Sequence, residues 1–185
     1  LIVDNSKTEG APVIVDYNPT YYNLVGEVEY DNEYGNLTTD FMKIKPGLMH
    51  RANGGYLIIQ AQDLLSNVQA WEALRRIIKT KEITIENLRD QVGAIAVTTL
   101  KPEPIPSDVK VILVGGAYYY ELLRGYDEDF SKLFKIRADF DYEMDRNDEN
   151  IFKIAGFISK FCENEKTLPF DSSAVASVIE YSSRS

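Results

Sequence analysis

The sequence has one cysteine, one histidine and no second cysteine or histidine with which to build a metal cluster. A lone cysteine, Cys162, excludes an internal disulfide, and its place on the apolar side of an expected helix favours a small buried thiol over a nucleophile. His50 alone cannot assemble a zinc site of histidines and cysteines. A Ser-His-Asp triad would need His50, and no Gly-x-Ser-x-Gly turn accompanies it. These scarcities favour a structural role for His50.

Long apolar runs and an excess of basic residues are also missing. No run approaches the roughly 18 to 20 residues of a membrane span, and the start shows no signal peptide pattern, so no membrane partner is expected. The chain has 29 Asp and Glu residues and 20 Lys and Arg residues, which gives it a net charge of -9. Binding to nucleic acid needs a local excess of Lys and Arg, so this charge argues against such a partner. With 185 residues, 44% of them hydrophobic, the chain can form one medium domain with or without a small appendage.

The stretch from His50 to Leu65 joins a glycine turn, Gly54-Gly55, to an apolar run and then to a helix start. Four apolar residues, Tyr56 to Ile59, suit a strand that is covered on both faces, as in the parallel sheets of α/β proteins. Ligands of open α/β sheets bind beyond the carboxyl ends of the strands, where Gln60 to Asp63 fall. A core strand with no chemical function fits the pattern equally well.

Further elements are expected on both sides of this stretch. Strand-like runs occur at Leu1–Val3, Pro12–Val15, Ile83–Ile85, Ala94–Thr98, Val109–Val114 and Lys135–Asp141, of which Ile83–Ile85 and Ala94–Thr98 are expected to form an exposed hairpin. Tyr17–Gly26 is interpreted as a loop. Helical spacing predicts an amphipathic helix through Ala70–Ile78, capped by Ser66 or Asn67, and a short helix at Ala117–Arg124 that Gly125 ends.

From Asp145 onward the apolar spacing is helical. One helix is expected through Ile151–Phe161 and a second through Ala174–Ile179, with Asp171 as its N-cap. The prediction is an α/β core over residues 1–144 and a small helical subdomain over 145–185. The acidic residues Asp16 and Asp127–Asp129 are interpreted as solvated, and no Gly-x-x-x-x-Gly-Lys-Ser/Thr phosphate-binding loop occurs.

Several blocks of sequence carry a family resemblance. The run Lys45-Pro-Gly-Leu-Met-His-Arg-Ala-Asn-Gly-Gly-Tyr-Leu-Ile-Ile resembles the approach to the Walker B strand in Lon-like ATP-dependent proteases of the peptidase S16 family. Further blocks of the resemblance appear in the same order along the chain: Ala11-Pro-Val-Ile-Val-Asp, Asn18-Pro-Thr-Tyr-Tyr-Asn, Trp71-Glu-Ala-Leu-Arg-Arg, Glu103-Pro-Ile-Pro-Ser-Asp, Tyr126-Asp-Glu-Asp-Phe and Val178-Ile-Glu-Tyr-Ser-Ser-Arg.

The resemblance implies a partial AAA+ module, a parallel sheet without its phosphate-loop strand, followed by the start of a helical lid. It also implies a cytoplasmic, homo-oligomeric ring that uses ATP and Mg²⁺ to unfold protein substrates and deliver them to a Ser-Lys peptidase domain. Neither the phosphate loop nor that peptidase domain is in this chain. We therefore expect no ATP or Mg²⁺ to bind to it.

This sequence departs from the family pattern at the positions that would perform hydrolysis. Where the resemblance implies a metal-organising aspartate and a neighbouring acid, the chain has Gln60 and Ala61, and its first acid is Asp63. An amide lacks the charge that holds Mg²⁺ and polarises water. The sensor position falls on Gly116. For the arginine finger the candidates are Lys132 and Arg137.

These departures favour impaired hydrolysis in a module that still couples nucleotide state to unfolding. The alternative is a non-catalytic structural or oligomerisation module with a degenerate nucleotide site, and an unrelated small-molecule binder is a third hypothesis. By the same resemblance, Tyr21 and Tyr22, followed by Gly26, are candidates for a pore loop that grips substrate. The opposing interpretation is that both tyrosines pack on the body of the domain.

Overall fold

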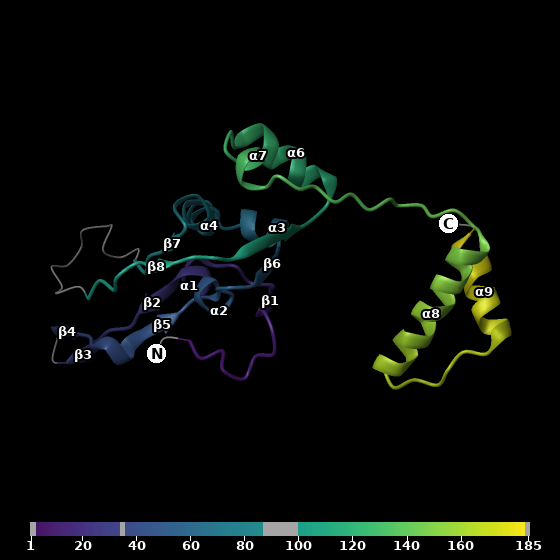
Figure 1. Cartoon of the computed structure of the whole chain (residues 1–185), viewed down its shortest axis with the longest axis horizontal. Coiled ribbons are helices and arrows are strands. Elements are labelled where there is room, and N and C mark those ends of the chain that lie inside the picture. The colour runs from purple at the N-terminus through teal and green to yellow at the C-terminus, as the bar shows by residue number, and fades with distance from the viewer. Residues whose placement is uncertain (1–2, 34–35, 87–99, 184–185) are drawn as a thin grey trace. The chain divides into compact units, whose positions relative to one another are not determined.

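The computed structural model describes residues 3–33, 36–86 and 100–183 (Figure 1). The chain divides into two compact units, Leu1–Lys135 and Ile136–Ser185. No helix among the described residues is both long and apolar enough to cross a membrane. The expected strand at Leu1–Val3 falls largely outside the described residues, and Val3 itself is not in a strand.

The first unit is built on a parallel sheet of three strands, β1 (Val13–Asp16), β6 (Tyr56–Gln60) and β9 (Lys110–Val114). Their order is β1-β6-β9, and both pairings are parallel. The glycine turn before β6 fits closely against β1, because a side chain at Gly55 would collide with the carbonyl of Pro12. Tyr56 N–H donates to that carbonyl at 2.8 Å, which starts the register. The parallel sheet predicted from the apolar runs is confirmed.

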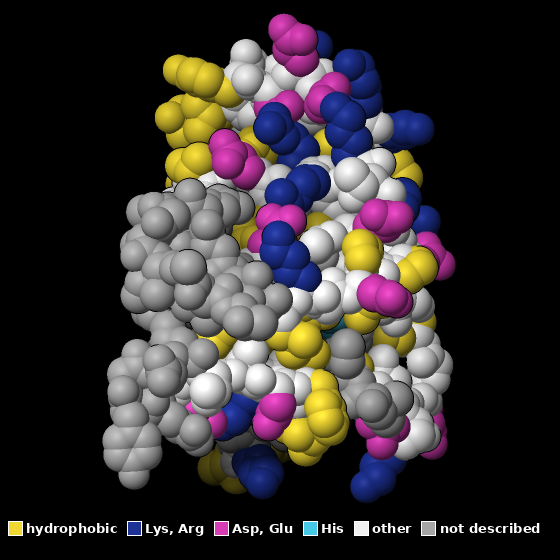
Figure 2. All heavy atoms as spheres, turned by 90° about the vertical axis from the view of Figure 1, so that its left-hand side faces the viewer, with side chains coloured by type: hydrophobic (Ala, Val, Ile, Leu, Met, Phe, Trp, Pro, Cys, Tyr) yellow, Lys and Arg dark blue, Asp and Glu magenta, His cyan; other side chains and the backbone are white. Residues whose placement is uncertain are grey.

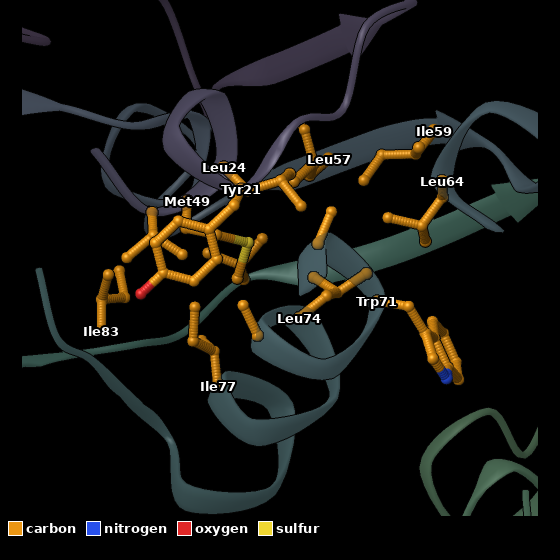
Figure 3. Packing of buried hydrophobic residues seen from close by; sticks show 14 of the residues in the cluster. Tyr21, Leu24, Met49, Leu57, Ile59, Leu64, Trp71, Leu74, Ile77 and Ile83 are labelled. Atoms are coloured by element: carbon orange, nitrogen blue, oxygen red, sulfur yellow. The ribbon is translucent and has the colours of Figure 1, made fainter. Parts of the chain in front are cut away.

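Among the helices that contribute to the core of this unit are α1 (Tyr21–Val25), α2 (Leu48–Arg51), α3 (Ala61–Leu65) and α4 (Val68–Thr80). As predicted, Asn67 caps α4, its side-chain oxygen accepting from Ala70 N–H at 3.3 Å. Leu57, Ile59 and Leu74 are completely buried where the sheet meets these helices (Figure 3). The prediction of a loop at Tyr17–Gly26 was wrong in part, because Thr20 caps α1 by accepting from Asn23 N–H at 3.3 Å.

Side chains alternate between the two faces of a strand, and the two faces of this sheet differ. On the packed face, Leu57 and Ile59 have no exposed surface, and Val111 and Leu113 contact the core cluster. The opposite face, which we call the bare face, keeps large apolar side chains in solvent. Their exposed fractions are 61% for Val13, 50% for Val15, and 43% each for Tyr56, Ile112 and Val114.

An antiparallel arm is inserted between α1 and α2. Its base is β2 (Gly26–Val28) paired with β5 (Ile44–Pro46), and its outer part is β3 (Asp31–Glu33) paired with β4 (Asn36–Thr38). A 3-10 turn, η1 (Phe41–Lys43), lies between β4 and β5. In Figure 1 the arm leads away from the parallel sheet. Residues Leu37–Met49 show no clear period in the sequence, and this arm was not predicted.

The predicted hairpin of Ile83–Ile85 with Ala94–Thr98 differs from the observed pairing. Instead, β7 (Glu82–Ile83) pairs with β8 (Ile105–Pro106), inside the proline-rich segment. The partner that was predicted, Ala94–Thr98, lies outside the described residues. After β9 follow α6 (Ala117–Tyr126) and α7 (Phe130–Leu133). Gly125 lies within the last turn of α6 rather than ending it.

Helix α7 and the turn before it contact α4 through aromatic rings and an ion pair. The rings of Trp71 and Phe130 are 6.3 Å apart, and Arg75 Nη1 lies 2.9 Å from Asp127 Oδ2. Asp127 is buried, which corrects the interpretation of this acidic turn as wholly solvated. Its Oδ1 also accepts from Asp129 N–H at 2.9 Å, so one carboxylate contacts α4 and shapes the turn between α6 and α7.

The predicted strand at Lys135–Asp141 was wrong, because this segment has no regular structure. Ile136 is 92% exposed and Phe140 is 89% exposed. An extended segment becomes a strand only when a neighbour accepts its backbone hydrogen bonds, and no described strand pairs with this one. The segment has the apolar alternation of a strand, but no strand among the described residues pairs with it.

The second unit contains two helices, α8 (Asp148–Asn164) and α9 (Ser172–Ser182), which contact each other. Asn147 caps α8, accepting from Asn150 N–H at 2.9 Å, and Asp171 caps α9 as predicted, accepting from Ala174 N–H at 2.8 Å. Cys162 is buried, as its place in the apolar pattern predicted.

Candidate functional site

The candidate site lies where β6 and β9 end side by side. Gln60 is opposite Val114 in the parallel register, so the next residues, Ala61 on one strand and Gly115 on the other, are neighbours. Helix α3 begins at Ala61 and helix α6 begins at Ala117, immediately beyond these strand ends. The structure therefore places Gly115 beside Ala61, and the part of these residues in a nucleotide site stays a prediction.

The contact between Ala61 and Gly115 is tight. Ala61 is 4% exposed, and a Cβ added to Gly115 would lie 3.1 Å from the Cβ of Ala61. Two small residues thus let the strand ends approach closely. By contrast, a Cβ added to Gly116 would meet nothing within 4 Å, so this position has room for a side chain but provides none. No side chain at Gly116 can orient a water molecule.

The charges at this strand end do not fit a Mg²⁺ ion. Gln60 is half-buried and neutral, and Asp63, one turn into α3, is exposed. The described part of the chain contains no group of three His, Cys, Asp or Glu side chains placed to hold a metal ion. Mg²⁺ is held in proteins mainly by carboxylates and substrate phosphates, and the last residues of β6 and β9, Gln60 and Val114, have no carboxylate.

The interpretation of Asp16 as a solvated acid was wrong, because Asp16 is half-buried at this edge of the sheet. It ends β1, opposite Ile59 of β6, and its Oδ2 is buried with no hydrogen-bond partner among the described residues. An acid directly after a strand-like run was the available signal. Nothing in the sequence shows that β1 lies beside β6, so this signal alone does not place Asp16 at the candidate site.

The two arginine-finger candidates are engaged in ion pairs. Lys132 Nζ lies 3.1 Å from Asp129 Oδ1, and Lys79 Nζ lies 2.8 Å from Asp129 Oδ2. Hydrogen bonds from Lys79 and then Lys132 lower the pKa of Asp129 to about 2. Arg137 Nε lies 2.7 Å from Asp139 Oδ1, in the second unit. A role for either residue in a neighbouring subunit's site stays a prediction.

The comparisons with known proteins concern this same part of the chain. Residues 9–141 match the model of a family described as LonB-like, AAA domain. The chain belongs to this family. It is 28% identical over 189 aligned residues to Archaeal Lon protease of Thermoplasma volcanium, and 28% identical over 189 to Archaeal Lon protease of Thermoplasma acidophilum. Each alignment covers 97% of this chain and 27% of the relative, so the chain spans about a quarter of their length.

Among solved structures, the fold of this LonB-like AAA chain is similar to that of NtrX from Brucella abortus. The TM-score is 0.53 with 16% identity, over 90% of this chain and 35% of the NtrX chain. That likeness concerns the fold alone, and it agrees with a partial AAA+ α/β module. The family resemblance inferred from the quoted blocks is confirmed.

In this LonB-like AAA chain the first pore-loop candidate is part of the core. Tyr21 is 5% exposed, and its hydroxyl donates to the Glu86 carbonyl at 3.2 Å. Burial, the largest cause, raises the pKa of Tyr21. The Tyr22 ring lies edge-on to that of Tyr21, 5.4 Å away, and packs against the core. The gripping role stays a prediction, and this burial counts against it.

His50 has a structural position in the same family module. It is 5% exposed in α2, and its Nδ1 accepts from Gly47 N–H at 3.3 Å. Its Nε2 is buried with no partner among the described residues. Burial lowers the pKa of His50, so the neutral ring is favoured in the folded state. The position agrees with the structural role that the lone histidine favoured.

Proposed function

We propose that this chain is part of the ATPase module of a Lon-like ATP-dependent protease, with ATP hydrolysis impaired. In that role it couples nucleotide state to the unfolding of protein substrates and their delivery to a Ser-Lys peptidase domain, in a cytoplasmic homo-oligomeric ring. The observation that carries the proposal is the strand end at Gln60-Ala61, which lies beside Gly115 at the place where α/β sheets bind ligands.

The impairment follows from charge. A carboxylate at the end of β6 would hold Mg²⁺ and polarise a water molecule, whereas the amide of Gln60 has no net charge and Ala61 has no polar side-chain atom. Loss of such an electrostatic group commonly costs several kcal/mol of transition-state stabilisation, by analogy with roughly 2.7 to 4 kcal/mol for one oxyanion donor. Asp63 is a turn further on and exposed, so it does not replace the missing charge.

The bare face of the sheet supports a further strand beside β9, which would be the phosphate-loop strand that the family resemblance implies. The three strands have the same order in the sheet as in the sequence, β1-β6-β9. Right-handed crossovers between them therefore place the connecting helices on one face of the sheet. A helix on the bare face requires a crossover in the reverse direction, from a strand beside β9 into β1. The strand ends beside such a reversal are where open α/β sheets bind their ligands.

The second candidate function is a non-catalytic structural or oligomerisation module. The bare face favours it, because apolar side chains such as Val13 and Ile112 remain in solvent and can be covered by another polypeptide. Both candidate functions are compatible with the family fold. They differ in whether nucleotide binding still changes the state of the module.

Phosphate release in the presence of ATP and Mg²⁺ tests the proposal. We expect no turnover above buffer from the unmodified chain, and none from the Gln60→Asp/Ala61→Glu double variant, because the phosphate-binding groups are not among its residues. Turnover by the unmodified chain that Gln60→Ala abolishes would contradict the proposal. Sedimentation velocity with and without ATP separates the candidates: assembly that depends on ATP favours the ATPase module, and assembly that ignores ATP favours the structural one.

A further inference from the structure

We propose that a hollow at the carboxyl end of β1 binds a basic α-amino acid such as arginine, through its two cationic groups and its carboxylate. The hollow has a volume of about 340 Å³, and its wall comes from the end of β1, from α1 and α2, and from the base of the arm. Ligands of open α/β sheets bind at this end of the strands. Four charged side chains line the hollow: Asp16, Glu27, Lys45 and Arg51.

Asp16 supplies the most enclosed charge of the hollow. It is the last residue of β1, it is half-buried, and its Oδ2 is buried with no hydrogen-bond partner among the described residues. A buried carboxylate oxygen without a partner destabilises the fold unless a donor reaches the group. Ammonium and guanidinium groups carry donors and no acceptor. A cation in the hollow would therefore satisfy Asp16.

Glu27 supplies a second carboxylate. In the register of β2 with β5 it lies opposite Lys45, but Lys45 Nζ lies 3.6 Å from Glu29 Oε2, so another acid neutralises that base. No ion pair joins Glu27 to a cation in the described part of the chain. The two strands are held closely together here, since a Cβ added to Gly26 would lie 2.3 Å from the Lys45 carbonyl oxygen. Glu27 is thus available to a second cationic group.

Arg51 supplies the positive charge. It is the last residue of α2, and its backbone is fixed, because its N–H donates to the Gly47 carbonyl at 3.2 Å and its carbonyl accepts from Asn5 Nδ2 at 3.5 Å. Its guanidinium is exposed and has no ion-pair partner within residues 3–33, 36–86 and 100–183. A planar guanidinium binds a carboxylate through two parallel hydrogen bonds. Arg51 and Asp16 therefore line one hollow without pairing with each other, and both charges remain for a ligand.

Two polar side chains of α1 complete the hollow, and their own contacts orient them. The half-buried Tyr22 ring lies edge-on to that of Tyr21, with the centroids 5.4 Å apart. An aromatic face attracts an ammonium or guanidinium group. Asn23 Nδ2 donates to the Asn18 carbonyl at 2.8 Å, which leaves Asn23 Oδ1 as an acceptor. An aromatic ring and a further acceptor favour a cationic ligand.

The charges of the hollow select the ligand. The carboxylates of Asp16 and Glu27 outnumber the one unpaired guanidinium, that of Arg51, so the complementary ligand has two cations and one anion. A basic α-amino acid has this composition: an α-ammonium, a cationic side chain and an α-carboxylate. On the face of the molecule in Figure 2, acidic and basic side chains are interspersed, so no field of one sign there would outweigh these local groups. A volume of about 340 Å³ is near the lower end of ligand pockets, roughly 300 to 1,000 Å³, which suits so small a ligand.

Titration of the isotope-labelled chain with L-arginine, followed in amide NMR spectra, tests the site. We expect saturable shifts of the signals near Asp16 and Glu27, with a dissociation constant of about 1 mM or below. Asp16→Asn should weaken binding at least about tenfold, because it removes the charge that faces the cation of the ligand. Glu103→Gln, which removes an exposed carboxylate outside the hollow, is the matched control and should bind unchanged.

Two analogues of arginine test the contact with the ligand carboxylate. Agmatine lacks that carboxylate, and Nα-acetyl-L-arginine amide represents an arginine residue inside a polypeptide. Each should bind at least about tenfold more weakly than L-arginine. Arg51→Gln should weaken the binding of L-arginine about tenfold and leave that of agmatine unchanged, because only L-arginine has the carboxylate that Arg51 contacts.

Three outcomes overturn the proposal. They are the absence of saturable shifts with L-arginine, equal binding by the unmodified chain and by Asp16→Asn, and equal binding of L-arginine and the acetylated amide. The last would assign the hollow to arginine residues of polypeptides. The dispersion of the amide signals confirms that the variants fold. The inference goes beyond the proposed function, because Gln60, Ala61 and Gly115 do not line the hollow, and phosphate release does not report on it.

Discussion

The two faces of the parallel sheet are made from alternate residues of the same three strands, and only one of them is covered. Ile59 on the packed face has no exposed surface, while Ile112 on the bare face, on the neighbouring strand, is 43% exposed. Both faces have apolar side chains. Parallel sheets are normally covered on both faces, so the bare face has the composition of a core without the contacts of one.

This difference explains why sequence patterns predicted β6 and β9 so readily. Uninterrupted apolar runs such as Tyr56–Ile59 are typical of strands that are covered on both faces. The strands β6 and β9 have such apolar runs, although one of their faces is exposed here. The helices α1, α2, α3 and α4 pack in one core with the packed face and leave the bare face exposed. We therefore expect the two faces to contribute unequally to the stability of this chain.

The largest effect should come from truncating an isoleucine on the packed face. Ile59→Ala is expected to lower the free energy of unfolding by about 3 kcal/mol, because it removes a fully buried side chain and leaves a cavity. The matched change Ile112→Ala should cost less than about 1 kcal/mol, since much of that side chain already contacts water. Urea denaturation measures both values. Equal losses would show that the bare face is covered in solution.

A smaller effect is expected from the ion pair that joins α4 to the turn before α7. Asp127→Asn should cost about 2 kcal/mol, because the buried carboxylate accepts from Arg75 and from Asp129 N–H. Glu121→Gln is the control, since the pair of Glu121 with Arg124 is 4.0 Å long and exposed, and it should change stability by less than about 0.5 kcal/mol. Thermal unfolding compares the two. If both changes are neutral, packing alone holds α7 in place.

The smallest effect concerns pH. Burial holds the pKa of folded His50 below its ordinary value of 6.5, so the unfolded chain binds more protons than the folded chain as the pH falls below that value. The contribution of His50 to stability is therefore complete above about pH 6.5 and is lost as the pH falls toward the folded pKa. We expect His50→Leu to weaken the loss of stability between about pH 7.5 and about pH 5.5. An unchanged pH profile would assign that loss to other groups.

Sequence patterns predicted the elements that are determined by residues close together in the sequence. The caps at Asn67 and Asp171 and the buried strands at Tyr56–Gln60 and Lys110–Val114 depend on side chains and spacings within a few residues. At the candidate site, the strand end at Gln60 is visible in the pattern, whereas Ala61 and Gly116 were assigned roles only through the family resemblance. The contact between Ala61 and Gly115 required the register of two strands that are about fifty residues apart in sequence.

What the sequence missed depends on distant partners. Lys135–Asp141 has the alternation of a strand, but no strand among the described residues pairs with it, and Ile83 pairs with Ile105 inside the proline-rich segment. The arm escaped prediction because its strands are only three residues long, too short to show a period. Tyr21 resembled a loop residue, yet the helix of which it is the first residue turns it into the core.

The central proposal is that the ends of β6 and β9 lie at a nucleotide site that lacks the charged groups for hydrolysis. Isothermal titration calorimetry of the unmodified 185-residue chain with ATP and Mg²⁺ tests it most directly. The account predicts no binding in the micromolar range, because Gln60, Ala61, Gly115 and Gly116 present neither a carboxylate for the metal nor a cation for the phosphates. A micromolar dissociation constant that is lost in the Gly115→Val variant would contradict the account and place a working nucleotide site at this strand end.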